Sequence, residues 1–235
     1  MTGATMTRAR RALPGMLVFA ALMLPGAAPA NCTDAPEAGV DWSECEKRRL
    51  ILAGRNLSGG RFVQTDFGRT DLSRANLTAT HFSGASLDHA RLRGADLSRA
   101  RLDKVNAYRA DFSGARLIDA HLVKAELTRA NLSLADLSGA DLRKADLGRT
   151  VLKGAKLERA NLSGAEMGRA VMNEAKLAGA NFKGADLLRT RIEDVDLTRA
   201  TGLVQAQLDG SCGNAGTKLP AGLKRPASWP CPPEE

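Results

Sequence analysis

Leucine recurs at every fifth position through most of this 235-residue chain. From Leu52 to Leu197, a step of five residues visits 30 positions, which hold 21 Leu, five Phe, two Met, one Ile and one Ala. At the positions two places earlier, Ala occurs 20 times and Thr or Val seven times. One residue before the core series, Asp or Asn occupies 15 positions. A repeat this regular limits the fold more strongly than any other feature of the chain.

A period of five fits neither an α-helix nor a straight β-strand. In a helix, five residues advance about 500°, which would spread successive Leu side chains around every side. In a strand, an odd step alternates faces, so half of the Leu residues would face water. The chain can direct every fifth residue inward only if it turns between repeats and coils around its own core. The other outward positions then include the turns, where Gly and Asn are expected because they tolerate positive φ.

The repeats Ala-Asp-Leu-Ser-Arg at 95–99 and Ala-Asn-Leu-Ser-Gly at 160–164 resemble the A(D/N)LXX consensus of the pentapeptide-repeat family. The resemblance covers residues 50–199 and implies an all-β fold, a right-handed quadrilateral β-helix with four pentapeptides, about 20 residues, per coil. We therefore expect a solenoid over residues 50–200 of about 7.5 coils, from 30 repeats at four per coil, roughly 36 Å long at about 4.8 Å per coil.

Two irregularities interrupt the repeat. Ala107 puts a small side chain at an inward position, beside the larger Val105 and just before Tyr108. The phase then slips by one residue at Thr201-Gly202. We expect the β-helix to end at this slip.

The ends of a stacked coil expose unpaired backbone and apolar side chains, which must be covered. Residues 31–49 and 201–235 are therefore predicted to form an N-terminal and a C-terminal cap. Trp42 and Trp229 both lie in these segments, outside the repeat. Each is predicted to plug an end of the rod, with stacking against a ligand as the alternative.

All four cysteines also lie in the predicted caps. An even number of Cys in an exported chain favours disulfides, and four Cys allow three connectivities. The local pairs Cys32–Cys45 and Cys212–Cys231 are favoured because a long repeat would hold the two ends apart. Zinc binding is the alternative, although the chain lacks CxxC and CxxH spacings.

The N-terminal segment 1–30 has the pattern of a secretory signal peptide. Basic residues (Arg8, Arg10 and Arg11) precede the apolar stretch Met16–Leu24, which is shorter than the roughly 20 residues that a bilayer requires. Ala28-Pro29-Ala30 then predicts cleavage between Ala30 and Asn31. We expect an exported protein, periplasmic or secreted, with no transmembrane segment in residues 31–235. The alternatives are a buried N-terminal helix and lipidation of Cys32, which Asn31 disfavours because lipid-attachment motifs require a small residue there.

One basic residue type recurs with the period expected of a coil. Arginine occupies every twentieth position at Arg109, Arg129, Arg149, Arg169 and Arg189, the arginine column, and Arg69 and His89 continue the series backward. A run at 25-residue spacing also exists: Arg74, Arg99, Lys124 and Arg149. An acidic or amide residue stands three positions before most members of the longer series, at Asp66, Asn106, Glu126, Asp146, Glu166 and Asp186. The column is either a polyanion-binding ladder or a face whose charges pair internally, and pairing is expected because the acids are adjacent.

Residues that could carry catalysis occupy outward positions without a convergent arrangement. His81 and His121 would share a face two coils apart, about 10 Å, which is too far for joint metal ligation, and His89 is also outward. The sequence contains no G-x-S-x-G, P-loop or G-x-G-x-x-G motif. Carboxylates could pair as they do in glycosidases, although the A(D/N)L consensus explains their regular occurrence. We predict no catalytic, metal or cofactor site, and no enzyme.

Charge and compartment define the functional candidates. Without the segment 1–30 the chain has 31 Lys and Arg against 26 Asp and Glu, a mild excess that supports neither nucleic-acid binding nor a membrane-surface role. Some cytosolic members of the pentapeptide-repeat family are acidic DNA mimics that bind topoisomerases, a role that does not suit an exported basic chain. We predict a structural or protein-interaction scaffold of the cell envelope. The alternative is a polyanion-binding module that uses the arginine column.

The partner is accordingly expected to be an unidentified protein or an envelope polyanion, such as an anionic glycan or a lipid head group. A second copy bound through an end cap, which would give a homodimer, is another candidate.

Overall fold

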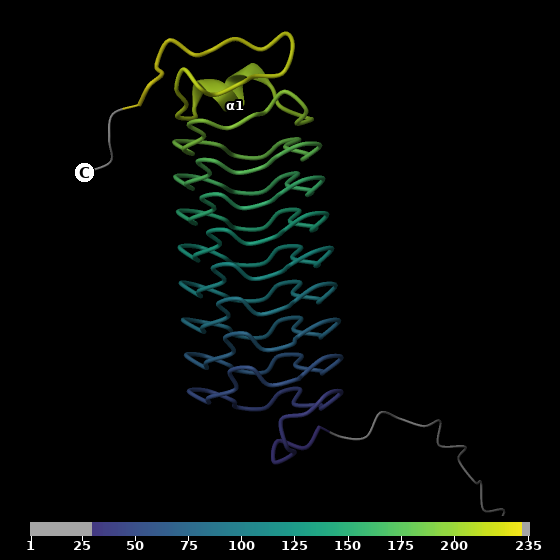
Figure 1. The fold of residues 1–235 in the computed structure, drawn as a ribbon. Coiled ribbons are helices and arrows are strands. Elements are labelled where there is room, and N and C mark those ends of the chain that lie inside the picture. The colour runs from purple at the N-terminus through teal and green to yellow at the C-terminus, as the bar shows by residue number, and fades with distance from the viewer. Residues whose placement is uncertain (1–29, 232–235) are drawn as a thin grey trace, which may run out of the picture.

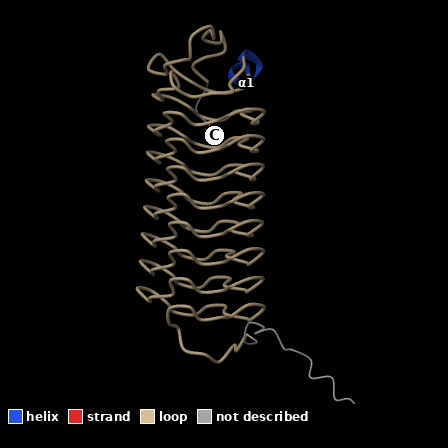
Figure 2. Ribbon diagram, turned by 90° about the vertical axis from the view of Figure 1, so that its right-hand side faces the viewer, coloured by secondary structure: helices blue, strands red, loops and turns tan. Residues whose placement is uncertain are grey.

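Parallel backbone bridges join residues that lie 20 positions apart, as in Asp41↔Arg61 and Asn181↔Thr201. The computed structural model describes residues 30–231, which wind into a straight rod of stacked coils (Figure 1). Each pentapeptide contributes one bridge residue, so the pairing consists of isolated bridges and not of long strands. The register of 20 confirms that four pentapeptides form one coil. The view turned by 90° shows the same stack from its side (Figure 2).

Within a repeat, each backbone N–H group has an acceptor, as the pentapeptide around Leu137 shows. The amides of Leu137 and Gly139 donate to carbonyls of the next coil at 2.7 and 2.9 Å, and the amide of Asp136 donates to the preceding coil at 2.9 Å. The amide of Ala140 closes a turn onto the Leu137 carbonyl at 3.0 Å. The remaining amide, that of Ser138, donates to Oδ1 of Asp136 at 3.2 Å. The Asp or Asn before the core residue thus supplies an acceptor for the one amide of the repeat that finds no backbone carbonyl.

The interior holds the residues that the five-residue period assigns to it. All 30 side chains of the series from Leu52 to Leu197 are buried, with at most 5% exposure. The small residues two places earlier are buried as well from Gly60 onward. Thr replaces Ala at some of these sites because its hydroxyl can reach a carbonyl, as Thr190 Oγ1 does in donating to Met167 at 2.7 Å. Ala107 and Val105 are both fully buried, so the irregular repeat keeps the same inward assignment.

The turns correct one expectation about residue types. From Leu52 to Ile192, the residue with positive φ is the second after each core residue, and it is Gly in many repeats, for example Gly139 at φ 72°. Asn is not found there among the described residues. In most repeats that contain it, Asn precedes the core residue, where its side chain accepts a hydrogen bond, as Asn161 does from the Ser163 amide at 3.1 Å. Arg and Lys occupy many of the positive-φ positions instead, for example Arg149 at φ 56°.

Backbone pairing extends past both limits that were predicted for the β-helix. At the N-terminal end it begins at Asp41, inside the segment 31–49. At the C-terminal end the expected stop at Thr201 is wrong, because Arg191 pairs with Cys212 and Asp196 pairs with Lys218. The bridged residues are 20 positions apart elsewhere in the rod, but one position more at the first of these bridges and two more at the second. The longer separation accommodates the inserted chain. The phase slip therefore widens the last coil without ending it.

The insertion contains helix α1 (Gln205–Asp209), which lies over the C-terminal end of the rod (Figure 1). Gln207 Nε2 donates to the carbonyls of Phe182 and Ala185 at 2.9 and 2.8 Å, which satisfies backbone acceptors of the coil beneath. In residues 30–231 the structure has no helix long and apolar enough to cross a membrane.

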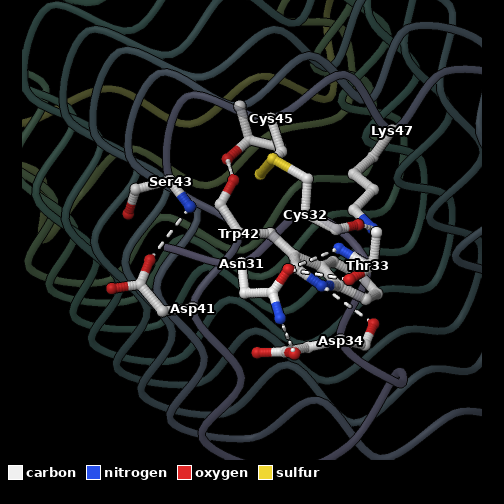
Figure 3. Close-up of a disulfide and its surroundings, with 10 residues drawn as sticks. Asn31, Cys32, Thr33, Asp34, Asp41, Trp42, Ser43, Cys45 and Lys47 are labelled. Carbon is white, nitrogen blue, oxygen red and sulfur yellow. Dashed lines mark hydrogen bonds between the residues drawn. A yellow bond between two sulfur atoms is a disulfide. The ribbon is translucent and has the colours of Figure 1, made fainter. Parts of the chain in front are cut away.

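The N-terminal cap is built around a disulfide and an aromatic plug (Figure 3). Cys32 and Cys45 are paired, with Cα atoms 5.5 Å apart. Trp42 is 1% exposed and donates its indole N–H to the Asp34 carbonyl at 3.2 Å. Lys47 occupies an inward position of the first coil; its ammonium lies 3.8 Å from the Trp42 ring centroid and donates to the Cys32 carbonyl at 2.6 Å. Burial lowers the Lys47 pKa, and the Asp34 charge opposes this shift.

The C-terminal cap repeats the combination of a disulfide with a buried Trp. Cys212 and Cys231 are paired, with Cα atoms 5.3 Å apart, so both disulfides are the local ones favoured by the sequence. The indole N–H of Trp229 donates to the Ser211 carbonyl at 2.8 Å. Gly213 lies directly against this ring, where a Cβ would come within 2.4 Å of it, so the close approach requires glycine. Trp42 and Trp229 both serve as plugs, as predicted.

Candidate functional site

The arginine column forms one edge of the rod. Bridges join Asn106, Glu126, Asp146, Glu166 and Asp186 in sequence, and these residues precede the column arginines by three positions. The arginines therefore follow one another at one-coil intervals, about 4.8 Å. All five are exposed. This register selects the 20-residue spacing over the 25-residue alternative, and Arg69 and Arg49 extend the series toward the N-terminal end with His89 as an exception.

The backbone conformation of this edge is unusual for its residue type. All five column arginines have φ between 54° and 61°, the left-handed region that favours glycine. A non-glycine residue there costs about 1 kcal/mol or more. The other three edges use glycine at several such positions, for example Gly84, Gly114 and Gly139, whereas the described coils have none on the arginine edge. The arginine edge thus retains long cationic side chains at a conformational cost.

The column arginines form no ion pair within residues 30–231. The expected pairing with the neighbouring acids is therefore wrong. The acids are engaged elsewhere: Asp146 accepts from the Gly148 amide at 2.8 Å and from Thr128 Oγ1 at 2.7 Å, and Asp186 accepts from the Leu188 amide at 2.9 Å. Asp146 and Asp186 thus complete turns of the repeat, and the column guanidinium groups remain exposed to solvent.

Near the C-terminal end of the column the surface is hollowed. Arg149, Arg169 and Arg189 surround a shallow depression of about 360 Å³ together with Gly168 and Leu188. Gly168 and Leu188 occupy the position just after the core residue, where the coils nearer the N-terminus carry Tyr108 and Thr128. The missing side chain of Gly168 opens the floor, and Leu188, 58% exposed, stands beside it.

The arrangement of this depression suits binding of an anion and not covalent chemistry. Guanidinium groups donate hydrogen bonds in a planar fork that matches carboxylate, phosphate and sulfate oxygens. The depression is lined by neither a nucleophile nor a titratable base. Among residues 30–231, no group of three or more His, Cys, Asp and Glu side chains is placed to hold a metal ion.

The histidines do not form a second site in the described coils. Bridges place His81 next to Arg61 and Arg101, and Arg101 next to His121, so His81 and His121 share a face with an arginine between them. Burial lowers the His81 pKa, and the charges of Arg101 and Arg61 lower it further. His89 lies beside Asp88, with Nδ1 3.0 Å from the carboxylate.

The predicted signal peptide falls almost wholly on residues 1–29, which lie outside the described residues. The predicted cleavage point, between Ala30 and Asn31, lies at the start of the described chain, and both residues are exposed. Asn31 Oδ1 accepts from the Thr33 amide at 3.2 Å, so this segment turns locally around Cys32, the first residue of the N-terminal disulfide.

Sequence reasoning found the column but missed the features that make it distinctive. The positive φ of its arginines and the open floor at Gly168 were not anticipated. Two signals were available in the chain: no glycine occurs in the series from Arg49 to Arg189 at 20-residue steps, and the residue before these arginines changes from Tyr108 and Thr128 to glycine at 148 and 168.

These observations define a β-helical repeat rod with capped ends and an exposed edge of stacked arginines. A family model described as pentapeptide repeats matches the chain in eight copies, at residues 52–87, 70–106, 80–117, 110–149, 135–173, 150–187, 165–201 and 175–212. Since these copies span more than half of its length, the chain belongs to the pentapeptide-repeat family. Members of this family form right-handed quadrilateral β-helices.

Solved structures of other pentapeptide-repeat proteins are similar to parts of the chain. HetL, involved in heterocyst differentiation regulation in the cyanobacterium Nostoc sp. strain PCC 7120, is 29% identical over 80% of this chain and 86% of HetL, with a TM-score of 0.44. QnrB1, a plasmid-mediated fluoroquinolone resistance protein, is 20% identical over 80% of this chain and 93% of its own, with a TM-score of 0.42. A protein of the Arabidopsis thaliana thylakoid lumen is 31% identical over 53% of this chain and 66% of its own, with a TM-score of 0.24. No curated protein matches the chain.

Proposed function

We propose that this protein is an exported, non-catalytic scaffold of the cell envelope that presents the long outer faces of its rod to a partner. The observation that carries this proposal is the pair of disulfides, one in each end cap. Disulfides persist in oxidising compartments, so they support export to the periplasm or the medium. The basic residues, apolar stretch and Ala-Pro-Ala sequence within the segment 1–30 support the same route.

Export and binding can be tested separately. Mass analysis of the protein isolated from the envelope or medium should give Asn31 as the N-terminal residue, and deletion of residues 2–30 should leave the chain in the cytosol with reduced cysteines. Recovery of wild-type protein in the cytosol with Met1 retained would contradict export, and a diacylglyceryl Cys32 would contradict the predicted cleavage.

For the scaffold role, a photo-crosslinking residue is placed on each of the four faces, at the exposed positions Lys183, Leu188, Lys153 and Lys176. A partner that binds one face should crosslink from that face only, and the other three positions are the matched controls. Equal crosslinking from all four positions to abundant envelope proteins would contradict a specific scaffold.

Polyanion binding through the arginine column is the second candidate, and one observation favours it. None of the ion pairs in the described coils uses an Arg or Lys with positive φ. The five arginines of the column belong to this group, so the column presents uncompensated charge. Changing all five column arginines to Gln should abolish retention on a heparin surface. Retention of the wild type should also fall with salt, because the Debye length shortens to about 10 Å at 0.1 M. Elution of wild type and variant at the same low salt would eliminate this candidate.

A further inference from the structure

We propose that the depression at Arg149, Arg169 and Arg189 is a discrete site for the phosphate or sulfate group of an anionic glycan strand that lies along the arginine edge. The proposal rests on the second candidate function and adds to it a location, a ligand class and a direction of binding. The proposal assigns the site to Arg149, Arg169 and Arg189 and not to Arg109 and Arg129, although these two arginines carry the same charge.

The three arginines are available for a ligand because nothing in the described chain neutralises them. Each is exposed, each has positive φ, and none forms an ion pair. Neighbouring members are one coil apart, about 4.8 Å. A tetrahedral oxyanion between two coils can therefore accept hydrogen bonds from two guanidinium groups at once, and each such bond is strengthened by charge on both partners.

The shape of the surface selects the C-terminal part of the column. Tyr108 and Thr128 fill the position beside the arginines in earlier coils, and Arg109 lies 5.2 Å from the Tyr108 ring centroid, in a cation–π contact. At Gly168 this position is empty, and the depression opens there between two arginines. Leu188 bounds it with an apolar side chain that can contact carbon atoms of a sugar ring. The combination of oxyanion donors with an apolar wall fits a sulfated or phosphorylated sugar better than a free anion.

The charges on either side of the edge favour a narrow strand over a flat membrane. Asp146, Glu166 and Asp186 run along the same face, three residues before the arginines. A planar anionic bilayer pressed against this face would bring its head groups close to those carboxylates, which would repel them. On the other side of the edge, the bridge positions of the next face carry Val151, Val171 and Arg191, and Arg191 is paired with Glu193. A strand at the edge meets the cations while remaining clear of the acids.

The test uses the full chain and a sulfated heparin octasaccharide as the probe, with affinity measured by isothermal titration calorimetry at fixed salt. In the site variant, Arg149, Arg169 and Arg189 are changed to Gln. The matched control changes Arg74, Arg99 and Arg159 to Gln; these arginines also have positive φ and form no ion pair in the described coils, but lie on other edges. We expect at least a tenfold loss of affinity in the site variant and less than a threefold loss in the control.

A charge-neutral variant separates a shaped site from diffuse attraction. Gly168 does not have positive φ, and a Cβ added there would meet nothing closer than 3.8 Å, so Gly168→Tyr can copy the side chain of Tyr108. Filling the depression should lower affinity at least tenfold without changing net charge. Gly168→Thr, which copies Thr128, is the second filler should the larger side chain disturb folding, and melting of each variant is checked by circular dichroism.

Each outcome decides between the two proposals. An unaffected affinity in both Gly168 variants, with equal losses in the site and control triples, would overturn the discrete site and leave diffuse polyanion binding in place. Failure of the wild type to bind both the octasaccharide and phosphatidylglycerol vesicles would remove the second candidate function and this inference together. Binding to phosphatidylglycerol vesicles but not to the octasaccharide, lost in the site variant, would assign the edge to a membrane and overturn the glycan strand.

Discussion

Two leucines separated by one residue test the inward assignment that underlies the fold. Leu132 is a core residue with 1% exposure, and Leu134, at the turn, is 71% exposed. Truncation of Leu132 to Ala removes three carbon atoms from the interior, which corresponds to about 2.4 kcal/mol at about 0.8 kcal/mol per buried methylene. Phe112 and Leu152, the core residues one coil below and above, are themselves fully buried, so collapse around the site is limited and a cavity contribution is added.

We therefore expect Leu132→Ala to lower the free energy of unfolding by about 3 kcal/mol. Leu134→Ala removes the same atoms from an exposed position and should change it by no more than about 0.5 kcal/mol. Urea denaturation of the oxidised protein, followed by circular dichroism at one temperature, measures both changes. Equal losses in the two variants, or a larger loss for Leu134→Ala, would refute the assignment of every fifth residue to the core.

Three further predictions concern the turns, a cap and pH. Asp136→Ala should lower the free energy of unfolding by about 1–2 kcal/mol, since the next turn amide loses its acceptor, whereas Asp136→Asn keeps the acceptor and should lose clearly less in the same urea assay. Replacement of Cys212 and Cys231 by Ser should destabilise the chain by about 3 kcal/mol through the freed loop, and a thermal melt unaffected by this change or by reductant would contradict a structural bond. Because the His81 pKa lies below its usual 6.5 in the folded state, the unfolded chain binds more protons than the folded chain just below that pH. Stability should fall as pH drops through this window, and His81→Asn should show a shallower fall in a pH series of melts.

The sequence alone determined the architecture because one pattern keeps the same phase from Leu52 to Leu197. The pattern places a core residue at every fifth position, a small residue two places before it and often Asp or Asn between them. Only a chain that coils around its own core can bury every Leu of such a pattern. The coil of four pentapeptides that the family resemblance implies predicted the stacking of Arg109 to Arg189, since a fixed number of residues per coil turns a sequence interval into a spatial neighbour. The disulfide pairs followed from the separation that a rigid rod imposes on its two ends.

Tertiary structure decided whatever depends on contacts between coils. Backbone pairing continues beyond Thr201 because the segment with α1 lengthens one coil, so that bridged residues lie farther apart in sequence. The five-residue phase of the sequence gives no sign of this pairing. Asp146 is adjacent to the arginine column in sequence, yet its carboxylate binds a turn amide and the Thr128 hydroxyl of the preceding coil, so adjacency of charges did not produce pairing. The open floor at Gly168 likewise exists only because residues 20 positions apart lie side by side. The five-residue period sets where each side chain points, whereas the hydrogen bonds between coils set which of the outward charges are left for a partner.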